Sequence, residues 1–386
     1  MKKKKLIKIS TVPQSLNGFC RGQLKMLSTY YEVVAVSSPE PELRMIEERE
    51  GVRTIAVPME RHISLFKDLR SLWRMVRVFR REKPDIVHSM TPKAGLVSML
   101  AAWICRVPVR MHTYTGLVFP TATGLLRQVL ILTDRILCFC ATDINPESLG
   151  VKADLERCHI TRKPLRLIAN GNVRGVDMDY YDRTPEVMAK ASKLRMPGVF
   201  TFCFVGRLVG DKGINELVEA FDRLHREIPA TRLLLVGPYE NELDPLKPNV
   251  DERIRRGDGI EAVGSQRDPR PYYAASDALA FPSYREGMPN VVLEAGAMGL
   301  PSIVTDINGS REIIRQGYNG VVIPPRDAEA LYQAMSRFAT CREETARLAA
   351  NARKNVADRY EQKMVWRALL AEYNRLAKND RKEGRE

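Results

Sequence analysis

Short apolar, β-branched runs alternate with helix-like stretches along this chain of 386 residues, and the alternation occurs twice. Continuous apolar strands that alternate with helices are typical of parallel sheets covered on both faces. The sequence therefore predicts an α/β fold with two doubly wound, Rossmann-like domains. The expected strands of the first series are residues 6–10, 31–38, 52–58, 84–90, 107–114 and 166–170, and those of the second are 201–207, 232–237, 259–264, 277–283, 301–306 and 320–325.

A polar stretch with two prolines separates the two series, and we expect the linker near residues 180–198. This places one domain at residues 1–182 and a second at residues 198–359. The chain closes with a helical segment over residues 360–380, in which apolar residues recur on one stripe. These residues are Trp366, Leu369, Leu370, Tyr373 and Leu376.

Charge and cysteine content restrict the setting in which the chain works. The formal net charge of +14 favours anionic partners, which include nucleic acid, acidic lipid and phosphorylated ligands. The seven cysteines are scattered without a CxxC pair, which indicates reduced thiols in the cytoplasm. The apolar run after the first lysines is too short for an export signal, and the most apolar long window, residues 125–141, carries three charges. We therefore expect contact with a membrane only from its surface.

The segment REGMPNVVLEAGAMG (285–299) predicts a short helix over residues 289–298. Pro289 suits the first helical position and Gly299 suits the C-terminal cap. The unpaired N–H groups and the dipole at such a helix start form a site for an anion such as a diphosphate. The residues that would provide this site are Gly287, Met288, Pro289, Asn290 and Val291.

Two carboxylates bracket this helix start. Glu286 lies just before the helix, where it can reach hydroxyls beside the diphosphate, and Glu294 lies one turn further in. A carboxylate offers paired acceptors at about the spacing of the two hydroxyls of a ribose. The simpler alternative is that Glu286 is a solvated loop residue and Glu294 an exposed helix residue. The apolar neighbours of Glu294 argue against an exposed position for Glu294.

The segment FVGRLVGDKGI (204–214) follows the first strand of the second series and carries Arg207 and Lys212. Two cations in a glycine-containing loop at the carboxyl end of a strand would neutralise a diphosphate and the charge that develops as it leaves. The alternative is a solvated basic loop. The segment lacks the GxxxxGK[ST] pattern, which disfavours a P-loop nucleotide hydrolase.

Together these segments resemble the retaining glycosyltransferases of family 4 with the GT-B fold, known as glycosyl transferases group 1, and the resemblance covers nearly the whole chain. Its core is the Glu-x7-Glu spacing of Glu286 and Glu294. It extends through LLLVGPYE, NGSREII (308–314) and NGVVIPP (319–325), and through KPDIVHSMTPKAGL and NGNVRGVDMDYY in the first half. The family includes bacterial capsule, lipopolysaccharide and exopolysaccharide enzymes.

The resemblance implies a GT-B fold in which two Rossmann-like domains face a cleft, with the helix at 360–380 packed back onto the N-terminal, acceptor-side domain. It implies that Arg207 and Lys212 bind the diphosphate, that Glu286 faces the donor sugar and that Glu294 holds the ribose. The backbone of residues 288–291 would hold phosphate. The turn at 264–268 would contact the base, with uracil favoured, through Gly264, Ser265 and Arg267. No metal is expected.

The first half departs more from the family pattern. Many members have a glycine pair after the first strand, for which Gly18 or Gly22 is the counterpart, and we expect Gly18 to approach the donor. A histidine that follows a strand near the transferred sugar corresponds to His112, which we list with Glu286, Arg207 and Lys212 as catalytic. An alternative alignment places Thr115 there, and His112 can also be a histidine bonded within the fold.

The resemblance implies transfer of a hexose or N-acetylhexosamine from a nucleotide diphosphate sugar, with UDP favoured, to a saccharide acceptor. The basic helix-like segment 61–84 is foremost a surface helix that faces the core, but with the lysines at 2–5 it could also lie on an anionic bilayer. With an apolar acceptor-side loop at 114–126, this favours a lipid-linked acceptor, such as a polyprenyl diphosphate saccharide, and a peripheral place on the inner face of the cytoplasmic membrane.

Two other functions are alternatives to glycosyl transfer. A sugar-nucleotide epimerase of similar shape would need further acid–base carboxylates, for which the sequence has no matching motif. A nucleic-acid-binding protein would account for the basic charge, but the cations are dispersed and no RNP, KH or helix-turn-helix pattern occurs. We therefore expect no nucleic-acid partner.

Overall fold

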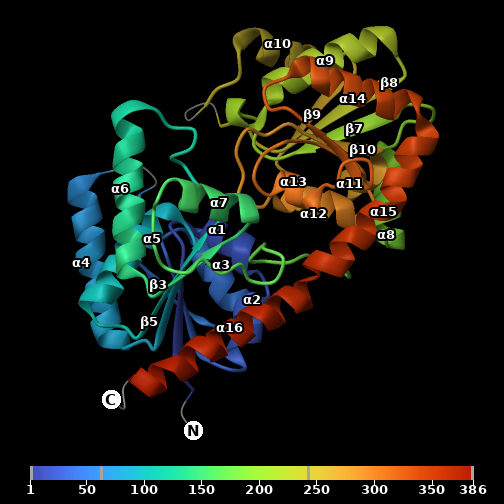
Figure 1. Ribbon diagram of the computed structural model, residues 1–386. Helices are drawn as coiled ribbons and strands as arrows, with labels where there is room; N and C mark the ends of the chain where they lie inside the picture. The colour runs from blue at the N-terminus through green and yellow to red at the C-terminus, as the bar shows by residue number, and fades with distance from the viewer. Residues whose placement is uncertain (1–2, 61–63, 241–243, 384–386) are drawn as a thin grey trace. The chain divides into compact units, whose positions relative to one another are not determined.

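The computed structural model describes residues 3–60, 64–240 and 244–383 of the chain (Figure 1). The chain folds into two compact units. The first comprises residues 1–175 together with 363–386, and the second comprises residues 176–362.

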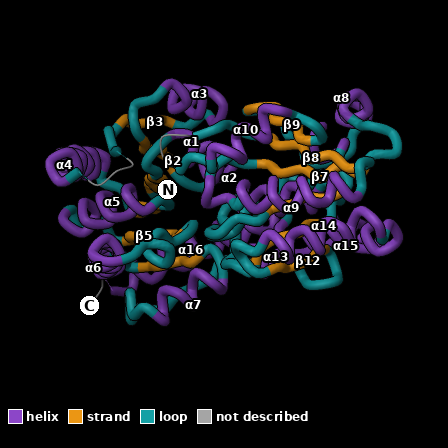
Figure 2. Tube along the Cα trace, turned by 90° about the horizontal axis from the view of Figure 1, so that it is seen from above, coloured by secondary structure: helices purple, strands orange, loops and turns teal. Residues whose placement is uncertain are grey.

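A six-stranded parallel sheet forms the centre of the first unit, in the order β3-β2-β1-β4-β5-β6. Its strands are short, and most of their side chains are buried because helices cover both faces. Figure 2 shows these helices on either side of the strands. The strands are β1 (Lys5–Ile9), β2 (Glu32–Ser37), β3 (Arg53–Ala56), β4 (Ile86–Ser89), β5 (Val109–Tyr114) and β6 (Asp143–Pro146).

Alternate residues of these strands face two different helix layers. Ile7 and Val34 point into a core shared with α4, α5 and α6, whereas Leu6 and Val33 point into a core shared with α1, α2, α3 and α16. The period-two alternation of a strand thus divides one sheet between two cores. The helices of this unit are α1 (Pro13–Cys20), α2 (Gln23–Ser28), α3 (Pro41–Glu50), α4 (Leu65–Glu82), α5 (Pro92–Ile104), α6 (Gly124–Cys140), α7 (Leu149–Arg157) and α16 (Gln362–Glu383).

The second unit repeats the arrangement with a parallel sheet in the order β12-β11-β10-β7-β8-β9. The strands are β7 (Phe200–Val205), β8 (Thr231–Val236), β9 (Ile260–Gly264), β10 (Ala278–Phe281), β11 (Ser302–Thr305) and β12 (Gly320–Ile323). The helices are α8 (Pro185–Leu194), α9 (Ile214–Glu227), α10 (Pro248–Arg256), α11 (Arg270–Ala275), α12 (Asn290–Ala297), α13 (Ser310–Ile313), α14 (Ala328–Thr340) and α15 (Arg342–Tyr360), with a 3₁₀ turn at Gly210–Lys212.

The predicted α/β class with two doubly wound sheets is confirmed, and one predicted strand is wrong. Residues 166–170 are irregular, and the polar segment Asp143–Pro146 forms the sixth strand beside β5. Ala169 has a φ of 51°, which a strand does not tolerate, so the chain turns at this point. The Arg166 amide still bonds to the Ile144 carbonyl at 3.2 Å, so the segment runs along β6 without extending the ladder.

The change of unit lies at Gly175 and Val176, earlier than the linker expected at 180–198. The expected linker instead contains α8, which packs against α11 inside the second unit. Val176 enters that unit by exchanging backbone hydrogen bonds with Tyr360 and Gln362, at 2.8 and 2.9 Å. The second unit therefore begins before residue 180, and the polar stretch that suggested a linker belongs to this unit.

The last helix, α16, covers one face of the first unit's sheet. Leu369, Tyr373 and Leu376 of the predicted stripe are buried in the core with β1 and β4. The Tyr373 hydroxyl and the His88 Nδ1 atom are 2.5 Å apart, which ties the helix to β4.

Candidate active site

The strand order of the second unit marks where a ligand is expected. The chain runs from β7 outward to β8 and β9, then returns to the other side of β7 to form β10, β11 and β12. In open parallel sheets, ligands bind beyond the carboxyl ends of the strands at such a reversal. The loops that follow β7 and β10 flank this point, and they carry the predicted site residues.

An ion pair joins these two loops. The Lys212 Nζ atom lies 2.5 Å from Glu286 Oε1 and 5.9 Å from the centre of the Phe281 ring, and both charged side chains are largely buried. The Ser283 hydroxyl donates to the same carboxylate oxygen at 2.9 Å. Glu286 is therefore fixed on its inner side by Lys212 and Ser283. The sequence interpretation named the first two residues and missed Ser283 and Phe281, which immediately precede the motif.

Two glycines allow the backbone of these loops to approach other backbone closely. A Cβ at Gly213, which has a φ of 71°, would lie 2.1 Å from the Pro282 carbonyl oxygen, so the loops after β7 and β10 touch there. A Cβ at Gly237, which has a φ of 149°, would lie 1.8 Å from the Gly206 carbonyl oxygen. Only glycine fits either position, and the ends of neighbouring strands are thereby held together.

The start of α12 differs by one residue from the prediction. The helix begins at Asn290, so Pro289 is the capping residue and not the first helical residue, while Gly299 with a φ of 77° ends the helix as expected. Within the described part of the chain, the amides of Met288 and Val291 have no hydrogen-bond acceptor. Unpaired N–H groups at a helix start are the usual donors to bound anions.

A second glycine turn supports this helix start. A Cβ at Gly309, which has a φ of 74°, would lie 2.3 Å from the Gly287 carbonyl oxygen. The NGSREII segment therefore presses its backbone against residues 287–288 and fixes the path of the chain into α12. NGSREII was quoted above only as part of the family resemblance, and no role was predicted for Gly309, although an Asn-Gly pair is a sequence signal for such a bend.

Glu294 is buried, with 6 % of its surface exposed. Its Oε2 atom accepts a hydrogen bond from the Tyr273 hydroxyl at 3.2 Å. Tyr273 lies on α11, the helix that follows the turn at 264–268, so the carboxylate is directed toward the part of the unit expected to hold the base. The reading of Glu294 as an exposed helix residue is wrong.

Arg207 lies directly after β7, where its guanidinium pairs with the Glu240 carboxylate at 2.6 Å. Glu240 follows β8, and the sequence interpretation quoted it within LLLVGPYE without giving it a role. A diphosphate that binds Arg207 would compete with this carboxylate, just as it would compete with Glu286 for Lys212.

The turn expected at the base follows β9. Gly264 ends this strand with a φ of 68°, and its carbonyl oxygen accepts the Gly237 amide at 2.9 Å. Ser265 and Arg267 are exposed. The turn is thus attached to the end of β8, next to the close glycine contact described above.

The glycines predicted to act in the first unit have different surroundings. Gly18 lies inside α1, and a Cβ there would meet no atom within 4 Å. Gly22 has a φ of 75°, and a Cβ there would lie 3.0 Å from the Trp366 ring. Gly22 therefore serves the packing of α16, and Gly18 alone leaves open space above its backbone.

His112 and Thr115 occupy different environments at the end of β5. His112 is 1 % exposed, its Nδ1 atom is 2.8 Å from the Ser89 hydroxyl, and burial lowers its pKa to about 3. A Cβ at Gly95 would lie 2.5 Å from the ring, which shows how closely the core encloses it. Thr115 follows the strand, is only half-buried and donates to the Met90 carbonyl at 2.8 Å.

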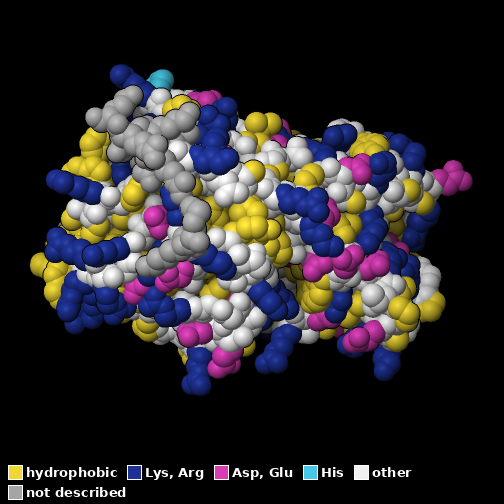
Figure 3. Space-filling model, turned by 90° about the horizontal axis from the view of Figure 1, so that it is seen from below, with side chains coloured by type: hydrophobic (Ala, Val, Ile, Leu, Met, Phe, Trp, Pro, Cys, Tyr) yellow, Lys and Arg dark blue, Asp and Glu magenta, His cyan; other side chains and the backbone are white. Residues whose placement is uncertain are grey.

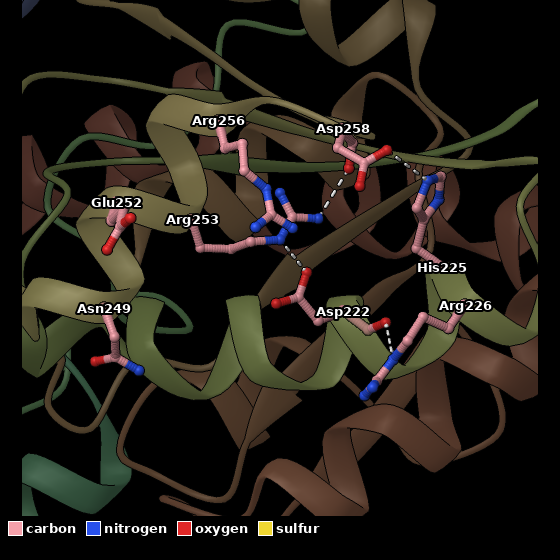
Figure 4. Close-up of a pocket in the computed structure, with 8 residues that line it drawn as sticks. All are labelled: Asp222, His225, Arg226, Asn249, Glu252, Arg253, Arg256 and Asp258. Carbon is pink, nitrogen blue, oxygen red and sulfur yellow. Dashed lines mark hydrogen bonds and ion pairs between the residues drawn. The ribbon is translucent and has the colours of Figure 1, made fainter.

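A separate polar pocket of about 440 Å³ lies between α9 and α10 (Figure 4). Its polar side chains face one another: Arg253 pairs with Asp222 at 2.6 Å, and the His225 ring lies 3.9 Å from the Asp258 carboxylate. The pocket is lined by the C-terminal part of α9, by residues along α10 and by Asp258, and the two helices lead into the amino ends of β8 and β9. It therefore lies at the end of the strands opposite to the predicted site.

Two kinds of feature are absent from the described residues. In residues 3–60, 64–240 and 244–383, no three histidine, cysteine, aspartate or glutamate side chains are grouped so that they could hold a metal ion. Over the same residues, every helix is too short or too polar to cross a bilayer.

Two parallel α/β units of this kind define the GT-B class of folds, and solved structures of that class match nearly the whole chain. HepE from Anabaena, solved in complex with UDP and glucose, is 19 % identical with a TM-score of 0.82, and the match covers 96 % of this chain and 99 % of that one. WaaG, a glycosyltransferase of lipopolysaccharide biosynthesis, is 16 % identical with a TM-score of 0.71, and the match covers 94 % and 98 % of the two chains.

Sequence comparison narrows the class to a family. Residues 199–340 match the model for glycosyl transferases group 1, and residues 26–171 match the glycosyl transferase 4-like domain. CapM of Staphylococcus aureus, a capsular polysaccharide biosynthesis glycosyltransferase, is 29 % identical over 98 % of this chain and 99 % of its own. A UDP-Gal:α-D-GlcNAc-diphosphoundecaprenol α-1,3-galactosyltransferase of Escherichia coli is 29 % identical over 75 % of each chain. The chain belongs to the group 1 glycosyltransferases of family 4.

Proposed function

We propose that the protein transfers a hexose or N-acetylhexosamine from a UDP-sugar, with retention of configuration, to a saccharide carried on a polyprenyl diphosphate. The observation that carries the proposal is the ion pair of Lys212 and Glu286, which joins the loops after β7 and β10 at the strand reversal of the second unit, four residues before α12 begins at Asn290. The proposal places the diphosphate of the donor there, with Arg207 beside it and Glu294 on the ribose.

Two relatives support the finer assignment. HepE was solved with UDP and glucose, and the Escherichia coli relative acts from UDP-galactose on a diphosphoundecaprenol-linked sugar. CapM and WaaG belong to capsule and lipopolysaccharide synthesis, in which bacterial surface polysaccharides are built. We infer the same kind of pathway for this chain.

In the proposed reaction, the bond between the donor sugar's C1 atom and the diphosphate breaks. The acceptor oxygen bonds to C1 on the same face, and its proton passes to an oxygen of the departing diphosphate. Lys212, Arg207 and the amides of Met288 and Val291 stabilise the charge on that leaving group, because they are preorganised where it accumulates. No carboxylate nucleophile is needed on this route.

Glu286 contributes by facing the donor sugar. Lys212 and Ser283 both donate to the Oε1 atom of Glu286, which fixes the orientation of the carboxylate. Its remaining acceptor positions can receive hydroxyl groups of the sugar. In the first unit, we propose Thr115 in preference to His112 for the position near the transferred sugar, because the His112 side chain is enclosed in the core and Thr115 is not.

A nucleotide-sugar panel tests the proposal. The protein is incubated with UDP-, GDP- and ADP-sugars, with and without a polyprenyl diphosphate saccharide, and the released nucleotide is measured. We expect release of UDP from one UDP-sugar, increased by the acceptor. An epimerase would change the sugar without acceptor-dependent release, and salt-sensitive RNA binding without consumption of any donor would favour the nucleic-acid alternative.

A further inference from the structure

We propose that helices α4, α5 and α6 together form a surface that docks on an anionic lipid bilayer. This goes beyond the expectation for segment 61–84, because the apolar part of the surface lies mainly on α6. Helix α5 packs between α4 and α6, and the three form one layer on one face of the first unit's sheet (Figures 1 and 2).

The outer side of α6 is an exposed apolar stripe. Leu125, Leu132 and Phe139 recur every seven residues and are 81 %, 57 % and 69 % exposed. Residues at this spacing lie along one side of a helix. Leu126, Val129 and Ile136 widen the stripe. A helix face of this composition, uncovered by the rest of its own unit, is expected to have a partner.

The other two helices extend the apolar surface. On α4, Phe66 is 90 % exposed, and Leu69 and Trp73 are also exposed. At the end of α5, Trp103 is exposed, and its ring centre lies 6.1 Å from that of Phe139 on α6. Aromatic and aliphatic side chains are the ones that enter the boundary between headgroups and acyl chains.

The charge around these apolar groups is mainly positive. Residues 64–141 contain twelve lysines and arginines but four carboxylates. In Figure 3, yellow and dark blue side chains border each other along the left edge of the molecule, the side on which Figure 1 places α4 and α6. The basic residues of this range are Lys67, Arg70, Arg74, Arg77, Arg80, Arg81, Lys83, Lys93, Arg106, Arg110, Arg127 and Arg135, of which Lys93 is largely buried against Asp68 and Arg110 is half-buried on β5.

The four carboxylates offset only part of this positive charge, and one of them, Glu82, pairs with Arg81 at 3.2 Å. Asp68 is paired with a lysine of α5, and Glu82 is buried beside Lys5 at 3.1 Å. Asp85 accepts the Lys5 amide at 2.7 Å. Asp134 is mostly buried, and burial raises its pKa to about 7, so it is only partly ionised at neutral pH. The surface thus presents arginines and lysines to whatever covers the apolar stripe.

An anionic bilayer fits this combination better than a second copy of the chain. A two-fold dimer through the same face would bring two surfaces of the same positive sign together. Acidic headgroups instead attract each exposed cation while the apolar side chains enter the membrane boundary. Only the role of this binding, which is to bring the enzyme to a lipid-linked acceptor, rests on the proposed function.

Vesicle flotation without any nucleotide sugar tests this surface. We expect the full chain to float with phosphatidylglycerol-containing vesicles, to bind pure phosphatidylcholine vesicles weakly, and to detach as salt is raised. Leu132→Ser combined with Phe139→Ser should lower the partition coefficient about tenfold or more. Arg70→Gln combined with Arg80→Gln should lower it about fivefold per charge removed. The control is Met45→Ser on α3, which is 63 % exposed on the opposite helix layer and should bind like the wild type.

Circular dichroism melting checks that each variant is folded. The inference is overturned if the wild type does not float with anionic vesicles, if both folded double variants float like the wild type, or if light scattering shows a dimer that the α6 variant abolishes without vesicle binding. Because no donor is present, flotation can succeed while the nucleotide-sugar panel fails, and in that case only the proposed function is lost.

Discussion

We expect Lys212→Ala to lower kcat by about 100- to 1,000-fold, the usual effect of removing one group that stabilises a developing oxyanion. Lys212 is the cation that links the loops after β7 and β10 through Glu286. Its loss removes positive charge from the proposed leaving-group site. Glu286 keeps its hydrogen bond from Ser283, so the loop should not unfold. Steady-state release of nucleotide, measured at saturating donor and acceptor, reports the change.

A matched lysine separates this effect from a general change in charge. Lys190 on α8 pairs with Glu186 at 2.7 Å on the exposed surface of the same unit, so Lys190→Ala removes the same side chain and the same kind of ion pair. Its turnover should stay within about twofold of the wild type, because exposed ion pairs contribute little. Turnover by Lys212→Ala close to that of Lys190→Ala would contradict the assignment.

We expect Gly237→Ala to destabilise the second unit by about 3 kcal/mol or more, because overpacking and a strained backbone add their costs. The new Cβ would lie 1.8 Å from the Gly206 carbonyl oxygen, and the residue would keep a φ of 149°. To relieve this collision, either the ends of β7 and β8 must move apart or the backbone at residue 237 must change its conformation. Urea unfolding followed by circular dichroism should show a lower midpoint.

The control is Gly198→Ala, which has a φ of 78° but open space around the added Cβ. It carries the backbone strain without the collision, so its cost should be about 1 kcal/mol. An unfolding midpoint for Gly237→Ala that equals the midpoint for Gly198→Ala would show that the backbone contact between Gly206 and Gly237 is not rigid.

The fold could be predicted because its strands are continuous apolar runs buried on both sides, and such runs are read directly from the sequence. The edge strand Asp143–Pro146 was not predicted, because three of its four residues are polar or proline. An edge position in a sheet tolerates such residues. The neighbouring segment 166–170 was mistaken for this strand because apolarity alone does not reveal that Ala169 has a positive φ.

Candidate site residues can be proposed from the sequence where a motif is local. Glu286, Glu294 and Lys212 each lie within a few residues of a glycine or of the proline that marks a helix start. Their spacing along the sequence therefore indicates what they could bind. Glu240 and Tyr273, which contact Arg207 and Glu294, come from other loops and other helices. The order of the strands in the sheet decides which loops lie next to each other, and therefore which side chains pair. A single sequence does not show that order.

The histidine illustrates the same limit. The predicted strand 107–114 contains β5, and His112 lies within this strand and does not follow it. Whether the side chain faces a ligand or the core depends on the alternation along that strand and on Gly95 of α5, which leaves room for the ring. The core encloses His112 and leaves Thr115 half-buried, so Thr115 is the residue of the two that can reach a ligand.

The most direct test of the donor site is a calorimetric titration of UDP and 2′-deoxy-UDP into the wild type, Glu294→Gln and the control Glu344→Gln, whose carboxylate pairs with Arg337 at 2.6 Å on α14. A hydrogen bond to a charged group contributes about 1.5–3 kcal/mol, so Glu294→Gln should bind UDP about 10- to 100-fold more weakly, while the control binds like the wild type. The wild type should prefer UDP over 2′-deoxy-UDP, and Glu294→Gln should largely lose that preference. Equal UDP affinity in the wild type and Glu294→Gln, or no UDP binding by the wild type, would contradict the account.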